Sequence, residues 1–134
     1  MEQSFPDALR EEFPNTIILP NPTQDEFFKF GNAQSCIVLH TLTTEAPLDS
    51  FKGINVPTAE KMLVDITLNP EFEFLHGSEL PHIYREVFSD FNISRTKLLR
   101  YARRRYCEKN IQHLLDRITI QDYDRSRKQK PGMD

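Results

Sequence analysis

The sequence predicts an α+β fold, a small mixed sheet of roughly three strands with four to five helices packed on it and a flexible C-terminal tail. Short β-branched runs occupy the first third of the chain, whereas apolar residues repeat at helical spacing over much of the remainder. The length of 134 residues, with 38% apolar and 28% charged side chains, fits one small globular domain with its own core.

Residues 1–15 are expected to form an extended N-terminal arm, residues 16–120 a single domain, and residues 121–134 a disordered tail. Pro6 and Pro14 interrupt the arm, and the tail is polar. No stretch approaches the roughly 18 uninterrupted apolar residues of a membrane-spanning helix. The start MEQSFPDALREEF has neither a basic leader nor an apolar core for export. We therefore expect a cytoplasmic protein that makes no contact with a membrane.

Local signals predict the elements of the N-terminal part. The β-branched run at 16–19 predicts a short strand. Thr23 and Glu26 have the spacing of a capping box, which predicts a short helix over 24–30. The apolar run at 35–42 contains no helix or strand breaker and predicts a strand buried on both faces. This strand is expected at the centre of the sheet.

A loop and a well-capped helix are expected next. The segment 43–57 has a loop-like composition, although 53–56 could add an edge strand. Thr58 is placed to cap a helix, and Glu60 lies in its first turn, where a negative charge suits the helix dipole. The segment 71–75 alternates like a strand, but it could equally be a loop that inserts phenylalanines into the core.

The C-terminal part predicts three helices. Ser78 is expected to cap the first and Ser94 the second. A kink or break near 108–110 is expected to precede the third, because the apolar face rotates there. The side chains expected on the inner side of the second helix are Leu98, Leu99, Tyr101, Ala102 and Tyr106.

The most informative feature is a concentration of positive charge. Residues 94–109 carry seven basic side chains and one acidic side chain, on a chain whose net charge is −3. Such asymmetry points to a partner. The candidate binding surface consists of Lys97, Arg100, Arg103, Arg104 and Arg105. Three interpretations stay open: a solvated or internally paired face, a surface for an acidic protein, and a weak nucleic-acid contact.

Catalytic and metal-binding patterns are weak. Cys36 and Cys107 stand apart, so we expect two reduced, partly buried thiols rather than a disulfide or a zinc site. No glycine-rich loop is present to wrap a phosphate. The carboxylates of Glu60 and Asp65 could hold a divalent ion and Lys61 could orient a phosphate, but the two carboxylates lie roughly 140° apart around a helix. We therefore expect no catalytic residue, no metal and no cofactor.

One segment resembles a known family. Val56–Ile66, with the sequence VPTAEKMLVDI, is similar to the v-x-T-x-E-K-x-L-x-D segment in the C-terminal domain of abortive-infection antitoxins of the AbiEi type. The residues from Leu75 to Arg105 resemble a related family of uncharacterised bacterial proteins. The resemblance covers about residues 17–118. It implies an antitoxin-like, non-enzymatic fold whose structural motif is Thr58, Glu60, Lys61 and Asp65.

In the AbiEi group an N-terminal winged helix binds the promoter, and the C-terminal domain counteracts a nucleotidyltransferase-type toxin encoded nearby. About fifteen residues precede the first predicted strand, which is too few for a winged helix, so promoter binding is not carried over. Our leading hypothesis is a regulatory interaction module of a toxin–antitoxin type system that acts through the basic helix. The alternatives are a nucleic-acid-binding domain and a metal-dependent nuclease or nucleotidyltransferase-like enzyme.

Overall fold

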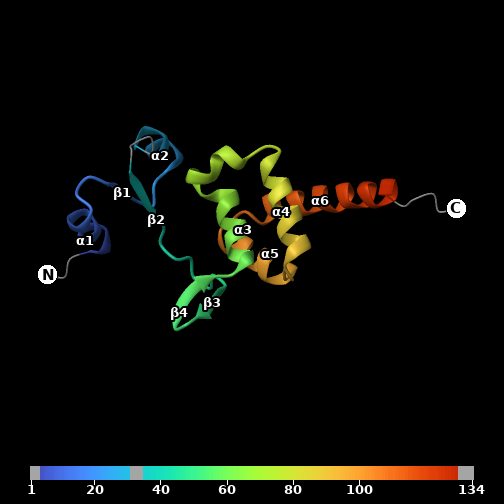
Figure 1. Cartoon of the computed structure of the whole chain (residues 1–134), viewed down its shortest axis with the longest axis horizontal. Coiled ribbons are helices and arrows are strands. Elements are labelled where there is room, and N and C mark those ends of the chain that lie inside the picture. Colours follow the sequence, from blue (N-terminus) through green and yellow to red (C-terminus); the bar gives the residue numbers. More distant parts are fainter. Residues whose placement is uncertain (1–3, 31–34, 130–134) are drawn as a thin grey trace. The chain divides into compact units, whose positions relative to one another are not determined.

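The computed structural model describes residues 4–30 and 35–129, with side chains up to residue 119. These residues form an α+β fold of helices and two small sheets, each of two strands (Figure 1). The chain divides into two compact units. Unit 1 comprises residues 1–42 with 69–74, and unit 2 comprises residues 43–68 with 75–134. The structure therefore differs from the single domain predicted over 16–120, because the strands pair in separate units and build no common sheet.

Unit 1 contains the first sheet. Its elements are α1 (Phe5–Glu12), β1 (Ile17–Pro20), α2 (Gln24–Phe30), β2 (Cys36–Leu39) and most of the 3₁₀ helix η1 (Pro70–Leu75). The strands β1 and β2 pair in parallel. The predicted capping box of α2 is confirmed: the Glu26 N–H donates to Thr23 Oγ1 at 3.1 Å, and the Thr23 N–H donates to Glu26 Oε1 at 3.4 Å. β2 has a single partner and is only partly buried, so it is not a central strand.

The predicted extended arm is wrong, because α1 occupies most of it. Ser4 Oγ accepts a hydrogen bond from the N–H of Asp7 at 3.3 Å, which caps the helix. Pro6 lies in the first turn, where its missing N–H has no helical partner to lose. Arg10 pairs with Asp7 at 2.9 Å. The proline thus starts a helix here instead of preventing one.

The segment 71–75 lies in η1 and is neither the predicted strand nor a loop. The side-chain amide of Gln24 donates a hydrogen bond to the carboxylate of Glu73. His40 Nε2 lies 2.7 Å from Glu71 Oε1. These two contacts attach η1 to the rest of unit 1.

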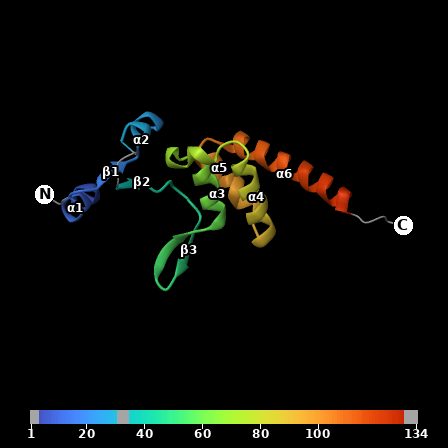
Figure 2. The same ribbon diagram turned by 45° about the horizontal axis from the view of Figure 1, so that its top comes forward.

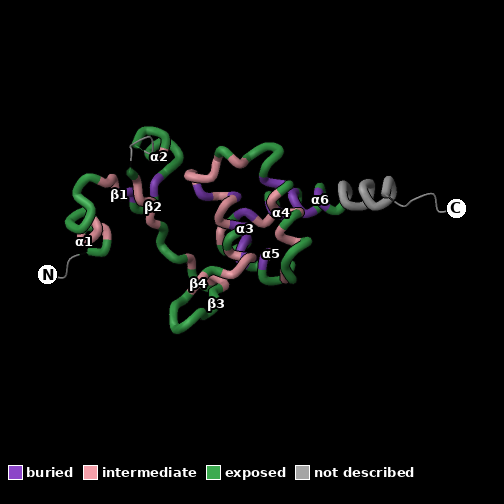
Figure 3. Tube along the Cα trace, viewed as in Figure 1, coloured by how far each residue is buried: buried purple, intermediate pink, exposed green. Residues whose placement is uncertain are grey.

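Unit 2 is built on helices that pack against one another. They are α3 (Ala59–Leu68), α4 (Glu79–Asp90), α5 (Arg95–Arg104) and α6 (Glu108–Gln129), and Figure 2 shows them from a second direction. Its largest fully buried side chains are Leu63, Val64, Tyr84, Leu98, Tyr101 and Ile111. Figure 3 shows that burial in this unit concentrates along these helices. The prediction that the helices pack on a sheet is therefore wrong, because their apolar stripes bury each other.

A hairpin precedes the helices. β3 (Leu48–Phe51) and β4 (Ile54–Pro57) pair in antiparallel fashion. Lys52 and Gly53 connect them with φ of 52° and 78°, both in the left-handed region that such a two-residue turn requires. The possible edge strand at 53–56 is therefore present, but its partner β3 lies in the segment predicted to be a loop. The hairpin is largely exposed, so its sequence lacks the pattern of buried apolar residues that would predict it.

The last helix begins earlier and ends later than the sequence predicts. The break lies at Arg105–Cys107, and α6 begins at Glu108. α6 continues to Gln129, past the predicted start of the tail at residue 121, because no proline or glycine occurs between residues 82 and 130. Residues 130–134 lie outside the described residues. No helix within the described ranges is long and apolar enough to cross a membrane.

Besides Thr23, three hydroxyl side chains were predicted to cap helices. Thr58 Oγ1 accepts from the Lys61 N–H and Ser94 Oγ from the Lys97 N–H, each at 3.2 Å, which confirms both caps. Ser78 stands in the N-cap position of α4, but its backbone is helical and its side chain makes no capping bond. The predicted Ser78 cap is therefore wrong in its chemistry, although α4 begins where expected.

Alanine substitutions should distinguish Ser94, which caps its helix, from Ser78, which does not. We expect Ser94→Ala to lower the free energy of unfolding by about 1 kcal/mol, because the Lys97 N–H loses its acceptor. Ser78→Ala should change it by less than about 0.5 kcal/mol. Urea denaturation measures both. Equal losses in the two variants would contradict the assignment of the caps.

Candidate binding surface on α5

Asp65 joins α3 to the C-terminal end of α5. Its Oδ1 atom accepts hydrogen bonds from Tyr101 Oη and Arg105 Nη1, each at 2.6 Å. Its Oδ2 atom pairs with Lys61 Nζ at 2.5 Å. The side chains of Asp65 and Lys61 are each 16% exposed, and Tyr101 is buried. Because this carboxylate is largely removed from water and fully engaged by donors, it fixes the end of α5 firmly.

The four residues of the predicted structural motif lie at the start of α3 and in this network. Thr58 caps the helix and also donates through Oγ1 to the carbonyl of Pro47 at 2.9 Å. Lys61 lies 5.7 Å from the ring centre of Tyr101 and pairs with Asp65. Glu60 is buried in the first turn. These positions stabilise the helix and its attachment.

The residues placed in the structure assemble no cluster of metal-ligating side chains. Among those residues, no group of three His, Cys, Asp or Glu side chains could hold a metal ion. The carboxylate of Asp65 accepts from three side chains, which leaves it poorly suited to bind a cation. Both cysteines are free thiols. Burial raises the pKa of Cys107 to about 11, so this thiol is a poor nucleophile at neutral pH.

α5 ends in a Schellman motif, with a tyrosine where glycine is usual. The Cys107 N–H donates to the carbonyl of Ala102 at 2.8 Å, and the Tyr106 N–H donates to the carbonyl of Arg103 at 3.1 Å. Tyr106 has φ of 59°, in the left-handed region. The left-handed conformation costs a residue with a Cβ atom roughly 1–2 kcal/mol.

The side chain of Tyr106 gains nothing from the protein interior in return for that strain. It is 97% exposed, whereas the sequence predicts it on the inner side of the helix with Leu98 and Tyr101. The prediction is wrong because α5 stops at Arg104 and the chain turns before position 106. The Schellman motif that ends α5 accounts for the left-handed backbone of Tyr106. Helical periodicity could not place this exposed side chain, because it assumes that the helix continues.

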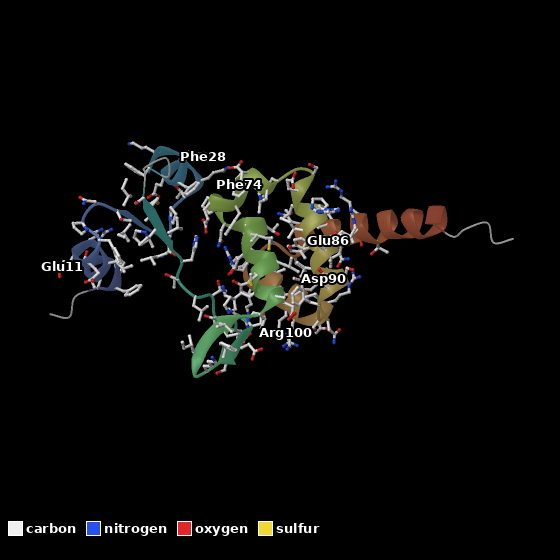
Figure 4. All side chains as sticks on the ribbon, viewed as in Figure 1. Glu11, Phe28, Phe74, Glu86, Asp90 and Arg100 are labelled. Atoms are coloured by element: carbon white, nitrogen blue, oxygen red, sulfur yellow. The ribbon has the colours of Figure 1, made fainter. Side chains whose placement is uncertain are left out.

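Arg100, Arg103 and Arg104 lie together on the exposed face of α5, and Figure 4 labels Arg100. With residues of the turn before β3, they line a cavity of about 600 Å³, which we call the arginine hollow. The lining residues are Thr43, Thr44, Glu45, Arg100, Arg103, Arg104 and Tyr106. The predicted surface is therefore concave, and it includes a turn far away in sequence.

Two of the three arginines are paired with carboxylates of the same unit. Arg103 donates to Glu108 through Nε at 2.9 Å and Nη2 at 3.1 Å. Arg104 donates to Glu45 through Nη2. Within the described part of the chain, Arg100 makes no side-chain hydrogen bond or ion pair. The surface is thus partly neutralised by the protein itself.

The remaining two candidate residues lie elsewhere. Arg105 is 22% exposed and is bound to Asp65, so it is not part of an outward-facing surface. Lys97 lines a second cavity of about 520 Å³ between α3, α4 and the β4 strand, which we call the apolar groove. The apolar side chains that line it include Val56, Met62, Ile66, Ile83, Val87 and Phe91. The sequence gave no indication of this groove.

Comparison with known proteins identifies one similarity. A family of unknown function, DUF6577, matches residues 1–121 of the chain. No curated protein and no solved structure matches it. The description of the family names no activity, so a function has to be inferred from the geometry above.

Removing the charge of Asp65 should destabilise unit 2. We expect Asp65→Asn to lower the free energy of unfolding by about 2 kcal/mol or more, because Lys61 and Arg105 lose their common partner. Asp116→Asn is the control, since Asp116 is exposed and accepts only from Gln112 in the described structure, at 3.1 Å. Thermal or urea unfolding that gave both variants the same stability would contradict the role of Asp65.

The Arg103–Glu108 pair predicts a pH dependence. Hydrogen bonds from Arg103 hold the pKa of Glu108 below its ordinary value of 4.5. A lowered folded-state pKa means that the pair stabilises the fold above the ordinary pKa and that this contribution is lost as pH falls through the lower value. In an NMR titration, Arg103→Ala should raise the pKa of Glu108 towards its ordinary value, whereas Arg95→Ala should leave it unchanged. A Glu108 pKa that is the same with and without Arg103 would exclude the pair in solution.

Proposed function

This chain belongs to the DUF6577 family, and from its α5 surface we propose that it is a non-enzymatic, cytoplasmic interaction module that binds an acidic, amphipathic segment of a partner protein. The single observation that carries the proposal is the meeting of two surfaces on α5. Lys97 lines the apolar groove, and Arg100 lines the arginine hollow. These residues are three positions apart, so they are neighbours on one face of the helix.

The combination of apolar and basic surface is characteristic of a protein interface. In the apolar groove, Met62 is 54% and Phe91 is 61% exposed. Interfaces of proteins combine an apolar centre with aromatic and arginine side chains, which contribute most of the binding energy. Lys97 lines the groove together with Asp49 and Glu60, and it can meet an acidic side chain of a segment whose apolar side fills the groove.

The antitoxin-like class of this module is supported by the resemblance of Val56–Ile66. In the structure this segment spans the second half of β4 and the greater part of α3, including Asp65. It therefore supplies the framework that holds α5, as the resemblance implies for Lys61 and Asp65. On this basis we propose that the partner is a nucleotidyltransferase-type toxin encoded beside this chain.

A nucleic-acid partner is the second candidate, because the exposed ring of Tyr106 lies in the same hollow as three arginines. Glu45 and Glu108 argue against a nucleic-acid partner. Each carboxylate is paired with an arginine of the hollow and would repel a phosphate backbone. A nuclease has less support, because Asp65 is engaged by Lys61, Tyr101 and Arg105.

Charge reversal tests the proposal on a surface that does not hold the fold together. Lys97 and Arg100 make no side-chain hydrogen bond within the described residues, so Lys97→Glu with Arg100→Glu should fold normally. We expect this double variant to bind the purified product of the neighbouring gene at least tenfold more weakly in calorimetry. Arg95→Glu, on the same helix but outside both cavities, should bind within about twofold of wild type.

Unchanged binding in the double variant, or no binding by wild type, would overturn the protein interaction. Retention of wild type on DNA or RNA at low salt, lost in the double variant, would replace it with nucleic-acid binding.

A further inference from the structure

The arginine hollow has the dimensions and charge of a site for a small anion. Its volume of about 600 Å³ falls in the range of roughly 300–1,000 Å³ that is common for small-ligand sites. Arg100, Arg103 and Arg104 line it together with Glu45. Arg103 and Arg104 are paired with Glu108 and Glu45, so Arg100 carries the positive charge that no carboxylate of the described residues pairs, and an anion that enters the hollow can pair it.

The paired arginines keep donors for such an anion. Arg103 uses Nε and Nη2 for Glu108, and Arg104 uses Nη2 for Glu45. A guanidinium group carries five N–H donors, so each of these arginines can bind a second acceptor. The two glutamates therefore orient the guanidinium groups without saturating them. The planar fork of arginine matches the oxygens of a phosphate, which makes phosphate the anion of choice.

The backbone of the hollow is strained at two points. Glu45 has φ of 63° and Tyr106 has φ of 59°, although neither is glycine. Both residues line the hollow, from a turn and a helix end that are distant in sequence. The turn is closed by a hydrogen bond from the Ala46 N–H to the carbonyl of Thr43 at 3.0 Å, and Thr43 and Thr44 also line the cavity. Tyr106 takes this conformation in the Schellman motif that ends α5, and Glu45 takes it in the turn, so hydrogen-bonded backbone fixes both sides of the hollow.

We propose that the arginine hollow binds a mononucleotide, with the phosphate on Arg100, Arg103 and Arg104 and the base stacked on Tyr106. The exposed ring of Tyr106 supplies the aromatic face that a base requires. A free nucleotide fits better than a polynucleotide, because Arg103 and Arg104 are already paired with Glu108 and Glu45 and only Arg100 of the hollow adds charge that the described residues leave unpaired, which suits a single phosphate group. The site holds phosphate by guanidinium groups and needs no glycine-rich loop. This inference goes beyond the protein interaction proposed above and does not depend on it.

Calorimetry on the whole chain tests the proposal with three probes. Adenosine 5′-monophosphate carries both the base and the phosphate, ribose 5-phosphate lacks the base, and adenosine lacks the phosphate. We expect the monophosphate to bind at least about tenfold more tightly than either of the others, because stacking and phosphate contacts add. Equal binding of adenosine 5′-monophosphate and ribose 5-phosphate would overturn the proposal, as would no binding of the monophosphate at millimolar concentration.

Two variants test the residues. Arg104→Ala should weaken the monophosphate and ribose 5-phosphate by about tenfold each, since both lose a charged donor. Tyr106→Gly should weaken only the monophosphate, by about tenfold. Glycine is favoured at this left-handed position, so Tyr106→Gly should melt at or above the temperature of wild type, and its loss of binding cannot come from unfolding. Arg95→Ala, which lies outside the hollow, is the matched control and should bind as wild type does.

Unchanged nucleotide binding in Tyr106→Gly or in Arg104→Ala would overturn the assignment. Tighter binding of a single-stranded oligonucleotide than of the monophosphate would overturn it in favour of a polynucleotide. Partner binding is measured without nucleotide and with variants at Lys97 and Arg100, so either proposal can fail while the other stands.

Discussion

The buried carboxylate of Asp65 is the constraint on which the candidate surface depends. It holds Tyr101 in the core and Arg105 at the end of α5, so it fixes the start of the turn that follows this helix. That turn carries Tyr106 out to solvent, beside the exposed arginines of the preceding helical turn. An interaction buried inside unit 2 thus shapes the surface of that unit.

The sequence predicts well those helices and strands that depend on residues close together in the chain. The capping box between Thr23 and Glu26 predicts the helix at 24–30. The side chain of Thr58 likewise predicts the beginning of α3, because it caps that helix. Strand pairing depends on the rest of the chain, and it was not predictable: β4 pairs with a segment that reads as a loop, in a hairpin too exposed to have an apolar pattern. The end of α5 was missed because a tyrosine takes the place of the usual glycine.

The sequence could predict only the part of the candidate site that lies on a single helix, α5. Helical spacing places Arg100 and Arg104 on the outer face of α5, and the structure has them there. Arg105 is drawn inward by an aspartate 40 positions earlier, and Arg104 meets a glutamate 59 positions earlier. No pattern in a single sequence reports contacts at such separation. The sequence alone therefore could not predict that the turn before β3 forms one wall of the arginine hollow.

The order of segments along the chain ties the two units to each other. The chain leaves unit 1 after residue 42, completes α3, returns to unit 1 for residues 69–74, and then enters unit 2 again. Neither unit is a continuous stretch of sequence. A single protease cut after residue 42 would leave η1 on the C-terminal fragment, so it would separate η1 covalently from its partners His40 and Gln24.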